Sequence, residues 1–328
     1  MKPVLISGIQ PTGQLHLGNY LGALKHFVDL QNSGRYDCFF FIADLHSLTE
    51  TFSPREKEKQ IADLLANYIA AGLDPKKSVL FLQSAIPPHA ELAWIFNAIT
   101  PFGELRRMTQ FKDKSETAPE NVNVGLFTYP ILMASDILLY DAKYVPVGDD
   151  QVQHLELART LARKFNTRFG KMFVEPQPLL TEVPRLMSLE NADKKMSKSQ
   201  PAGCLFLDDS PDAIRAKIKR AVTDSGRDIL FDPVKKPAVS NLLLIYSALA
   251  GRPISKIERE FAGKGYGEFK HTLAEVAVDA FEPFQKRKKT LLKNQKTLHK
   301  LLSAGNRKAL KVAETKIEDV KACLGLPV

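Results

Sequence analysis

The stretch that decides the fold is residues 4–19, which read VLISGIQPTGQLHLGN. An apolar strand at residues 4–6 leads through Gly8 and Gly13, which we expect to permit the turn, into a helical pattern that begins at Gly18. The carboxyl edge of a parallel sheet and the amino end of a helix are therefore expected to meet here, and that position suits phosphate groups. His16 and Asn19 lie in this turn. The stretch predicts a nucleotide site.

A second segment, KMSKS at residues 195–199, carries a lysine two residues before and one residue after Ser197. Such a loop can direct two ammonium groups toward one phosphate group. Taken alone, it is best interpreted as an ordinary basic surface loop, and His16 taken alone is more often a satisfied core histidine. The two segments together, in this order, favour the nucleotide site over both of these alternatives.

The first two hundred residues alternate between strand-like and helical patterns. Strands are expected at residues 4–6, 37–43, 79–83 and 145–147, and helices at 18–31, 53–71 and 151–165, with a mainly helical insertion at about 86–144. After about residue 206 only helices are expected, at 212–222, 241–250, 255–261, 267–303 and 307–324, with Pro283 kinking or splitting the fourth. This order predicts an α/β fold with a doubly wound parallel sheet and a second, all-helical C-terminal domain.

Composition limits the class of protein. With 328 residues, 44% hydrophobic and 25% charged, the chain fits about two globular domains, and general disorder is excluded. No apolar run approaches the roughly 18 residues that cross a bilayer, and the first residues read as a strand and not as a cleaved leader. Cys38, Cys204 and Cys323 lie far apart, so we expect reduced thiols in the cytoplasm, all three buried as small hydrophobes.

The net charge of +9 is concentrated near the C-terminus. Between residues 284 and 321 there are twelve lysines and arginines against three acidic residues, so this segment holds the whole surplus. A basic stripe on late helices predicts a polyanionic partner. A solvated helix face is the alternative, and the charge pattern alone does not separate the two.

These features together resemble the class I aminoacyl-tRNA synthetases. The opening SGIQPTG at residues 7–13, the KMSKS loop and GDDQVQH at residues 148–154 resemble most closely the bacterial tryptophanyl family. One departure is Asn19, because the first signature of the class ideally ends in histidine. The resemblance extends over nearly the whole chain.

The resemblance implies residues for ATP chemistry. It assigns catalysis to Lys195, Lys198, His16 and Asn19. It places ATP, used with Mg²⁺ and without a metal held by protein ligands, against Gln10, Pro11, Thr12, Gly18, Asn19, Gly148, Asp149, Asp150, Leu186, Lys195, Met196, Ser197, Lys198 and Ser199. Asp150 is alternatively a helix cap. Lys112 and Lys114 are candidates for the α-phosphate, with a solvated loop as the alternative.

Tryptophan recognition is expected on a helix over residues 125–140. Tyr129, Met133 and Asp136 share one face of it, and a carboxylate is a strong acceptor for the single N–H of indole. From spacing alone, Tyr129 and Met133 would be core and Asp136 would bond a backbone amide; the resemblance reverses that choice. It adds Gln151, Val145 and Val147 to the tryptophan site. His46, after the second strand, is a candidate lining residue, and His89 and Trp94 are interpreted as structural.

The implied organisation has three parts. Residues 1–205 form a Rossmann-like catalytic domain, residues 206–304 a helical anticodon-binding domain, and residues 305–328 a C-terminal helix that packs back on the catalytic domain. The implied partners are tRNA(Trp), L-tryptophan, ATP and a second copy of the chain, with no membrane. Three other functions remain open: a tyrosyl enzyme of the same architecture, a non-catalytic RNA-binding paralogue, and a small nucleotidyltransferase.

Overall fold

The computed structural model describes residues 2–109, 122–148, 151–180, 185–198 and 200–328. Contacts divide the chain into two compact units. The sheet unit comprises residues 1–12, 27–181 and 291–328, and the helical unit comprises residues 13–26 and 182–290. These units are defined by packing alone, so the functional division at residues 205 and 304 stays a prediction.

The sheet unit contains five parallel strands in the order β3-β2-β1-β4-β5. Their bounds are β1 (Val4–Ile9), β2 (Asp37–Ile42), β3 (Ser78–Leu82), β4 (Tyr144–Val147) and β5 (Gln177–Leu180). The order reverses between β1 and β4, which marks the switch point where ligands bind open α/β sheets. The predicted doubly wound parallel sheet is confirmed. The sequence analysis missed β5, a short edge strand that contains Pro178.

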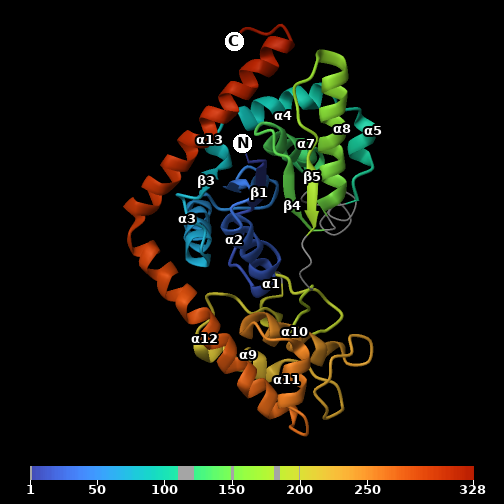
Figure 1. The fold of residues 1–328 in the computed structure, drawn as a ribbon, viewed down its shortest axis with the longest axis vertical. Helices are drawn as coiled ribbons and strands as arrows, with labels where there is room; N and C mark the ends of the chain where they lie inside the picture. The colour runs from blue at the N-terminus through green and yellow to red at the C-terminus, as the bar shows by residue number, and fades with distance from the viewer. Residues whose placement is uncertain (1, 110–121, 149–150, 181–184, 199) are drawn as a thin grey trace. The chain divides into compact units, whose positions relative to one another are not determined.

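Helices cover both faces of this sheet (Figure 1). In β2, alternate side chains point to opposite faces, so Phe40 stacks on Phe27 with ring centroids 4.6 Å apart while Phe39 packs against Tyr140 at 5.2 Å. This explains why the strand has no polar alternation. The helices of the unit are α2 (Lys25–Asn32, which begins in the helical unit), α3 (Pro54–Ala71), α4 (Pro88–Ile99), α5 (Phe102–Arg106), α7 (Val124–Leu138) and α8 (Val152–Phe169), with single-turn 3₁₀ helices η2 (His46–Thr49) and η3 (Gln83–Ala85).

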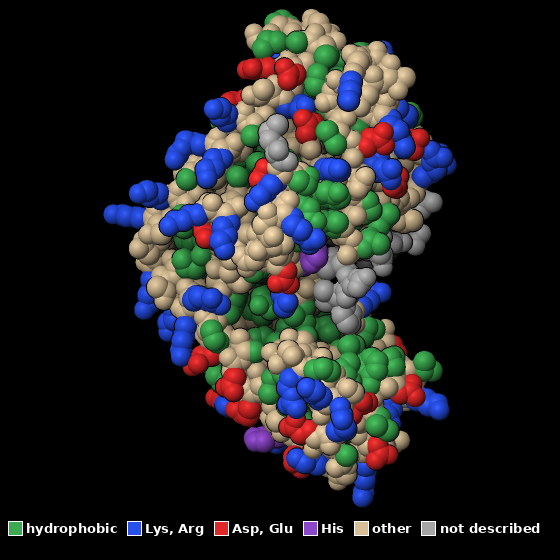
Figure 2. Space-filling view, in the orientation of Figure 1, with side chains coloured by type: hydrophobic (Ala, Val, Ile, Leu, Met, Phe, Trp, Pro, Cys, Tyr) green, Lys and Arg blue, Asp and Glu red, His purple; other side chains and the backbone are tan. Residues whose placement is uncertain are grey.

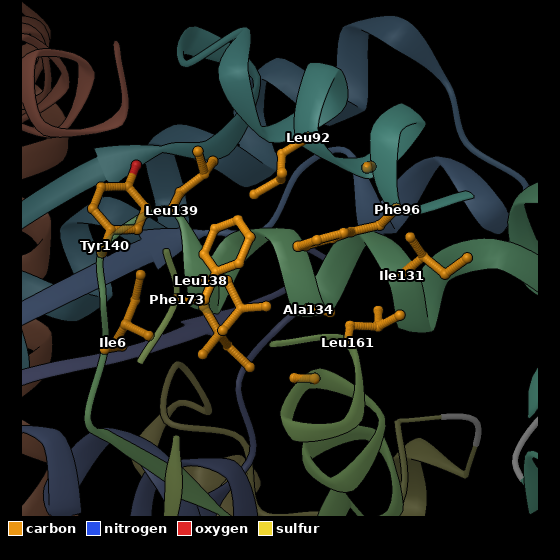
Figure 3. Close-up of a cluster of buried hydrophobic side chains, with 14 of the residues drawn as sticks. Ile6, Leu92, Phe96, Ile131, Ala134, Leu138, Leu139, Tyr140, Leu161 and Phe173 are labelled. Carbon is orange, nitrogen blue, oxygen red and sulfur yellow. The ribbon is translucent and has the colours of Figure 1, made fainter. Parts of the chain in front are cut away.

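An apolar core lies between the sheet and the helices α4, α7 and α8. Figure 3 shows Leu92 and Phe96 of α4 facing Ile131 and Ala134 of α7. All four side chains are completely buried. Burial of one such side chain contributes roughly 1.5–3 kcal/mol. This core fixes α7, the helix that carries the predicted tryptophan-binding residues.

The last helix, α13 (Gln295–Cys323), lies along strand β3 at the edge of the sheet (Figure 1). The Oδ1 atom of Asn306 accepts the backbone N–H of Leu82 at 2.9 Å, so a side chain satisfies a donor that the sheet leaves open. A Cβ atom on Gly305 would overlap the carbonyl oxygen of Leu80. Glycine at 305 therefore allows the helix to approach the strand closely.

The helical unit contains α1 (Leu17–Asn19), a π-helical turn η1 (Tyr20–Leu24), η6 (Pro201–Gly203), α9 (Pro211–Arg220), α10 (Pro237–Ala250), α11 (Ile254–Glu260) and most of α12 (Tyr266–Lys293). Its core includes the rings of Tyr246, Phe261 and Phe269. The predicted helix over residues 267–303 ends earlier than expected, at Lys293, and α13 begins after Asn294. Pro283 lies inside α12 and does not split it. The side chain of Asn294 accepts the N–H of Thr297 and caps α13, which starts earlier than the predicted residue 307.

Two further expectations concern membrane-spanning helices and cysteine burial. Among the described residues, no helix is both long enough and apolar enough to cross a membrane. Cys38 and Cys204 are buried as expected, and burial raises the pKa of both thiols. Cys323 is exposed, contrary to the prediction, because it lies in the last turn of α13.

Candidate active site

His16 is the N-cap residue of α1 and is 5% exposed. Its Nδ1 accepts the backbone N–H of Asn19 at 3.2 Å, and the Oδ1 of Asn19 accepts the backbone N–H of His16 at 3.4 Å. These reciprocal bonds form a capping box. Because Nδ1 acts as an acceptor, the proton of the neutral imidazole is on Nε2, which is thus a donor. The backbone N–H of residue 19 therefore fixes the tautomer of His16, while the Asn19 side chain caps the backbone of His16.

The charge state of His16 is set by its surroundings. Burial lowers the pKa of His16 to about 4, with the positive charges of Lys198 and Lys195 adding to the effect. The ring is accordingly neutral near pH 7. This electrostatic coupling shows that the N-terminal turn and the lysine-rich loop, nearly 180 positions apart in sequence, approach each other within the helical unit.

The lysine loop is a short antiparallel hairpin. Met187 pairs with Lys195, and the backbone N–H of Met196 donates to the carbonyl of Leu186 at 3.1 Å. Met196 is 2% exposed and anchors the hairpin, whereas Lys195 points its side chain into solvent. Lys198 is half-buried, and its Cδ lies 3.9 Å from where a Cβ on Gly13 would be. Ser199 lies outside the described residues.

Residues 204–207 connect the two segments through backbone pairing. Leu17 donates its N–H to the carbonyl of Leu205 at 2.8 Å, and Leu207 donates to Leu15 at 3.0 Å. On the other side, the thiol of Cys204 donates to the carbonyl of Ser197 at 3.0 Å. The turn and the loop thus share one rigid support. Sequence reasoning did not find this support, because an isolated pair of backbone bonds has no composition signal.

The glycines of the turn have different roles. Gly13 has φ +60°, so it permits the turn as predicted. Gly8 does not: it lies inside β1, where a Cβ would come within 2.6 Å of the Phe41 ring. Its role is to make room for that ring. A Cβ on Gly18 would come within 3.0 Å of the His16 ring, so Gly18 leaves space for the imidazole.

The sheet unit carries the other residues expected to bind ATP. Gln10, Pro11 and Thr12 follow the carboxyl end of β1, and Gly148 follows β4. Because β1 and β4 are neighbours at the switch point, these segments lie at the same edge of the sheet. Asp149 and Asp150 lie outside the described residues, as do Lys112 and Lys114.

Asp136 of α7 is the centre of a buried polar cluster and is 1% exposed. Its Oδ1 lies 2.5 Å from Nδ1 of His89 and 2.8 Å from Nε2 of Gln83, and its Oδ2 lies 2.7 Å from Nε2 of His46. Burial alone would raise the pKa of Asp136, but its interactions with His46 and His89 hold it below its usual range. We call these four side chains the Asp136 cluster.

The predicted backbone-amide alternative for Asp136 is not what the structure has, since its partners are side chains. A carboxylate offers about four lone-pair sites, and three are taken by these donors. Counting partners among the described residues, both sites on Oδ1 are used and one remains on Oδ2. The carboxylate can therefore accept one more hydrogen bond.

A cavity of about 170 Å³ lies beside the Asp136 cluster. His46 belongs to both, so it lines this cavity, and its role in binding a ligand stays a prediction. The ring of Tyr129 meets His46 edge-on with centroids 6.3 Å apart, and its hydroxyl lies 2.8 Å from Nε2 of His154. The lining residues are Leu45, His46, Leu48, Thr49, Asn123, Gly125, Thr128, Tyr129 and Leu132.

The other residues expected to bind tryptophan lie partly in the apolar core and partly at the start of α8. Met133 is half-buried and packs against the core that contains Val145 and Val147. Gln151 is the residue that precedes α8, and the capping alternative for Asp150 concerns a residue outside the described part of the chain. The binding roles of Met133, Val145, Val147 and Gln151 stay predictions. Trp94, which is interpreted as structural and not as a binding residue, is 75% exposed on α4.

Gln83 and His89 are site residues that the sequence analysis did not assign. Gln83 directly follows β3, as His46 follows β2 by a few residues, and polar residues after parallel strands meet at one edge of the sheet. The same rule could have predicted from the sequence that Gln83 lies at this edge. His89 was interpreted as structural, because nothing local to the helix α4 indicates that its ring reaches Asp136, 47 positions away.

Comparison with known proteins agrees with this geometry. Residues 1–282 match the family model of the class I tRNA synthetases for tryptophan and tyrosine (W and Y). The chain is 50% identical to the tryptophan–tRNA ligase of Caldanaerobacter subterraneus and 47% identical to that of Bacillus anthracis, over 98% or more of both chains in each case.

Among solved structures, tryptophanyl-tRNA synthetase from Mycoplasma pneumoniae superposes with a TM-score of 0.89 at 36% identity, covering 100% of this chain and 99% of that one. The Campylobacter jejuni enzyme, solved with ADP and tryptophan, gives 0.85 at 34% identity, covering 98% and 99%. This protein belongs to the family of class I tRNA synthetases for tryptophan and tyrosine.

Proposed function

We propose that the protein activates L-tryptophan with ATP and transfers it to the 3′ end of tRNA(Trp). In the first step the tryptophan carboxylate attacks the α-phosphorus of ATP, used as its Mg²⁺ complex, and pyrophosphate leaves. In the second step the acyl group of tryptophanyl-adenylate passes to the 3′-terminal adenosine of the tRNA, and AMP leaves. The enzyme is an aminoacyl-tRNA ligase.

The observation that carries the proposal is the convergence of His16 with Lys195 and Lys198 in one compact unit. The neutral His16 offers an N–H donor, and the lysines supply the positive charge that a departing pyrophosphate requires. Lys195 is exposed, so its ammonium group is accessible to a nucleotide. Such donors act most strongly on charge that develops in the transition state.

Selection of tryptophan is assigned to the Asp136 cluster. The indole ring offers one N–H donor and no acceptor, and Asp136 has one acceptor site left. Phenylalanine would leave that buried acceptor without a partner, which disfavours it without any editing domain. A tyrosine hydroxyl can also donate, so tyrosine must be rejected by shape, through Met133, Val145 and Val147.

The tRNA partner is assigned to the basic stripe. Figure 2 shows Lys and Arg side chains gathered along the margin where Figure 1 draws α13. Exposed members on this helix include Lys300, Arg307, Lys308 and Lys311. Lys316 is used internally instead, because it forms an ion pair with Asp141 at 2.6 Å. Exposed cations of this kind bind phosphate backbones.

A homodimer in the cytoplasm completes the proposal. Trp94, Phe102 and Val124 of the sheet unit are each more than 60% exposed, and large apolar side chains that are left in solvent favour association. Resemblance to the family gives a second copy of the chain as the partner. The anticodon would be read by one subunit while the acceptor end enters the other.

Amino-acid-dependent exchange of pyrophosphate into ATP tests the proposal. Exchange with tryptophan alone, followed by tryptophan-dependent charging of tRNA(Trp), is the expected result. Exchange with tyrosine in place of tryptophan would identify the sibling activity. Binding of tRNA without exchange would identify a non-catalytic paralogue, and exchange without any charging of tRNA would identify a small nucleotidyltransferase.

A further inference from the structure

We propose that His89, backed by Tyr140, is a positioning residue for substrate recognition: it holds the carboxylate of Asp136 so that a single acceptor site, on Oδ2, is left for a ligand N–H. This inference rests on the proposed activation of tryptophan. His89 is completely buried, and the residue that the cavity shares with the Asp136 cluster is His46. His89 therefore acts through Asp136.

Tyr140, His89 and Asp136 form a chain of hydrogen bonds in which each donor points toward Asp136. The carboxylate can only accept, so Nδ1 of His89 carries a proton and donates to Oδ1 at 2.5 Å. In the neutral ring Nε2 then accepts, and the hydroxyl of Tyr140 lies 2.9 Å from it as the donor. Tyr140 thus fixes the tautomer of His89 that serves Asp136.

Gln83 occupies the second acceptor site of the same oxygen, Oδ1 of Asp136. Its Oε1 accepts the backbone N–H of Leu45 at 3.1 Å and that of His46 at 3.4 Å, which fixes the amide orientation. Its Nε2 must then donate, and it does so to Oδ1 of Asp136 at 2.8 Å. Rotation of the carboxylate would break two bonds on Oδ1, so the vacant site stays on Oδ2.

Aromatic packing keeps the His89 ring in place. Its centroid lies 6.2 Å from that of Phe41, 6.0 Å from that of Phe81 and 5.6 Å from that of Tyr140. Figure 3 shows the Tyr140 ring beside Leu139 in the apolar core. The imidazole is consequently preorganised before any substrate binds, and this favours recognition because no ordering cost remains to be met on binding.

The arrangement predicts a specific chemical preference. A ligand with one ring N–H satisfies the vacant site, whereas an isosteric ligand without that donor leaves a buried acceptor unpaired. The preference for N–H therefore depends on His89, although His89 does not touch the ligand. A role in packing alone would lower stability and would affect both ligands equally.

The test compares tryptophan with 3-(1-benzothiophen-3-yl)alanine, in which sulfur replaces the indole N–H, in pyrophosphate exchange. We expect His89→Leu to lower the preference for tryptophan roughly 10-fold through KM with kcat retained, since a hydrogen bond to a charged group is lost. His89→Asn should retain most of the preference, because its amide N–H replaces Nδ1–H. Tyr140→Phe, which removes one hydroxyl, should lower the preference by roughly 3-fold.

The outcomes separate this inference from the proposed function. Equal losses for both amino acids in His89→Leu, with an unchanged preference in Tyr140→Phe, would overturn the positioning role. If His89→Leu fails to fold by thermal melting, Tyr140→Phe and His89→Asn decide: a lowered preference in the first and a retained one in the second supports the inference, and the absence of any change in the first overturns it. Failure of the unaltered enzyme to use tryptophan would overturn the proposed function, and this inference with it.

Discussion

The two candidate sites of the chain differ in how their polar groups are held. In the sheet unit, Asp136 is buried and receives three hydrogen bonds from side chains. In the helical unit, His16 is buried but Lys195 is exposed on a hairpin. The Asp136 site has most of its hydrogen-bond acceptors occupied by protein donors before a ligand binds. The lysine-loop site has an ammonium group, on Lys195, that is accessible to solvent.

This difference matches the demands of the two ligands. An aromatic side chain offers one weak N–H, so a rigid acceptor with a single vacant site gives the sharpest discrimination. A triphosphate carries several negative charges that shift during the reaction, so mobile ammonium groups are suitable partners. Rigid recognition and adjustable charge stabilisation are thus separated between the two units.

The largest effect is expected at Asp136. Asp136→Ala removes the acceptor for the indole N–H. The ratio of kcat/KM for tryptophan to that for phenylalanine should therefore fall on the order of 1,000-fold, which corresponds to a loss of several kcal/mol of discrimination. The KM for ATP should not change. An unaltered kcat/KM for tryptophan in a folded variant would remove Asp136 from the recognition site.

A smaller effect is expected at the lysine loop. Lys195→Ala and Lys198→Ala should each lower the rate of adenylate formation about 100-fold, with little change in tryptophan binding, because the ammonium groups act on charge in the transition state. Single-turnover kinetics with tryptophan and ATP measure this. Weakened tryptophan binding at a normal rate would contradict the assigned role.

The packing of α13 gives a prediction for stability. Gly305→Ala places a methyl group against the carbonyl of Leu80, so the free energy of unfolding should fall by about 2–3 kcal/mol. Gly267→Ala in the first turn of α12 is the matched control, since no atom lies within 4 Å of the added Cβ. Denaturant unfolding of both variants checks the contrast. Equal stability of the two variants would show that α13 does not approach β3 this closely.

The smallest effect concerns pH. The pKa of His16 is about 4 in the folded protein against 6.5 in a model compound, so the unfolded chain binds the proton first as pH falls. Stability is therefore lost between pH 6.5 and 4, by about 2 kcal/mol at pH 5. His16→Gln should lack this component. Parallel pH dependence of unfolding in both proteins would show that His16 is not buried beside the two lysines.

The sequence predicted the fold class because hydrophobic periodicity is local. It also predicted the turn at Gly13 and the place of His46 just after β2, since each depends only on the end of one strand and the residues that follow it. It misplaced the end of the helix over residues 267–303, because Pro283 is tolerated inside α12 and the break depends on the capping side chain of Asn294.

The parts that could not be predicted depend on tertiary contacts. His89 reaches Asp136 from another helix, and Gly305 matters only because Leu80 lies against it. Residues 204–207 support the turn through backbone bonds, which any side chains permit, and the loop through the Cys204 thiol. Local patterns contain no record of such contacts, so the sequence predicts candidate site residues but not the residues that support them.

A double-mutant cycle between His16→Gln and Lys198→Ala tests most directly whether the turn and the loop act on the same phosphate group. The measured quantity is the single-turnover rate of adenylate formation for the unaltered enzyme, each single variant and the pair. If both side chains meet one triphosphate, the double variant should lose less than the sum of the single losses by at least about 1 kcal/mol. Losses that add within about 0.3 kcal/mol would contradict the convergence of the two segments on one ligand.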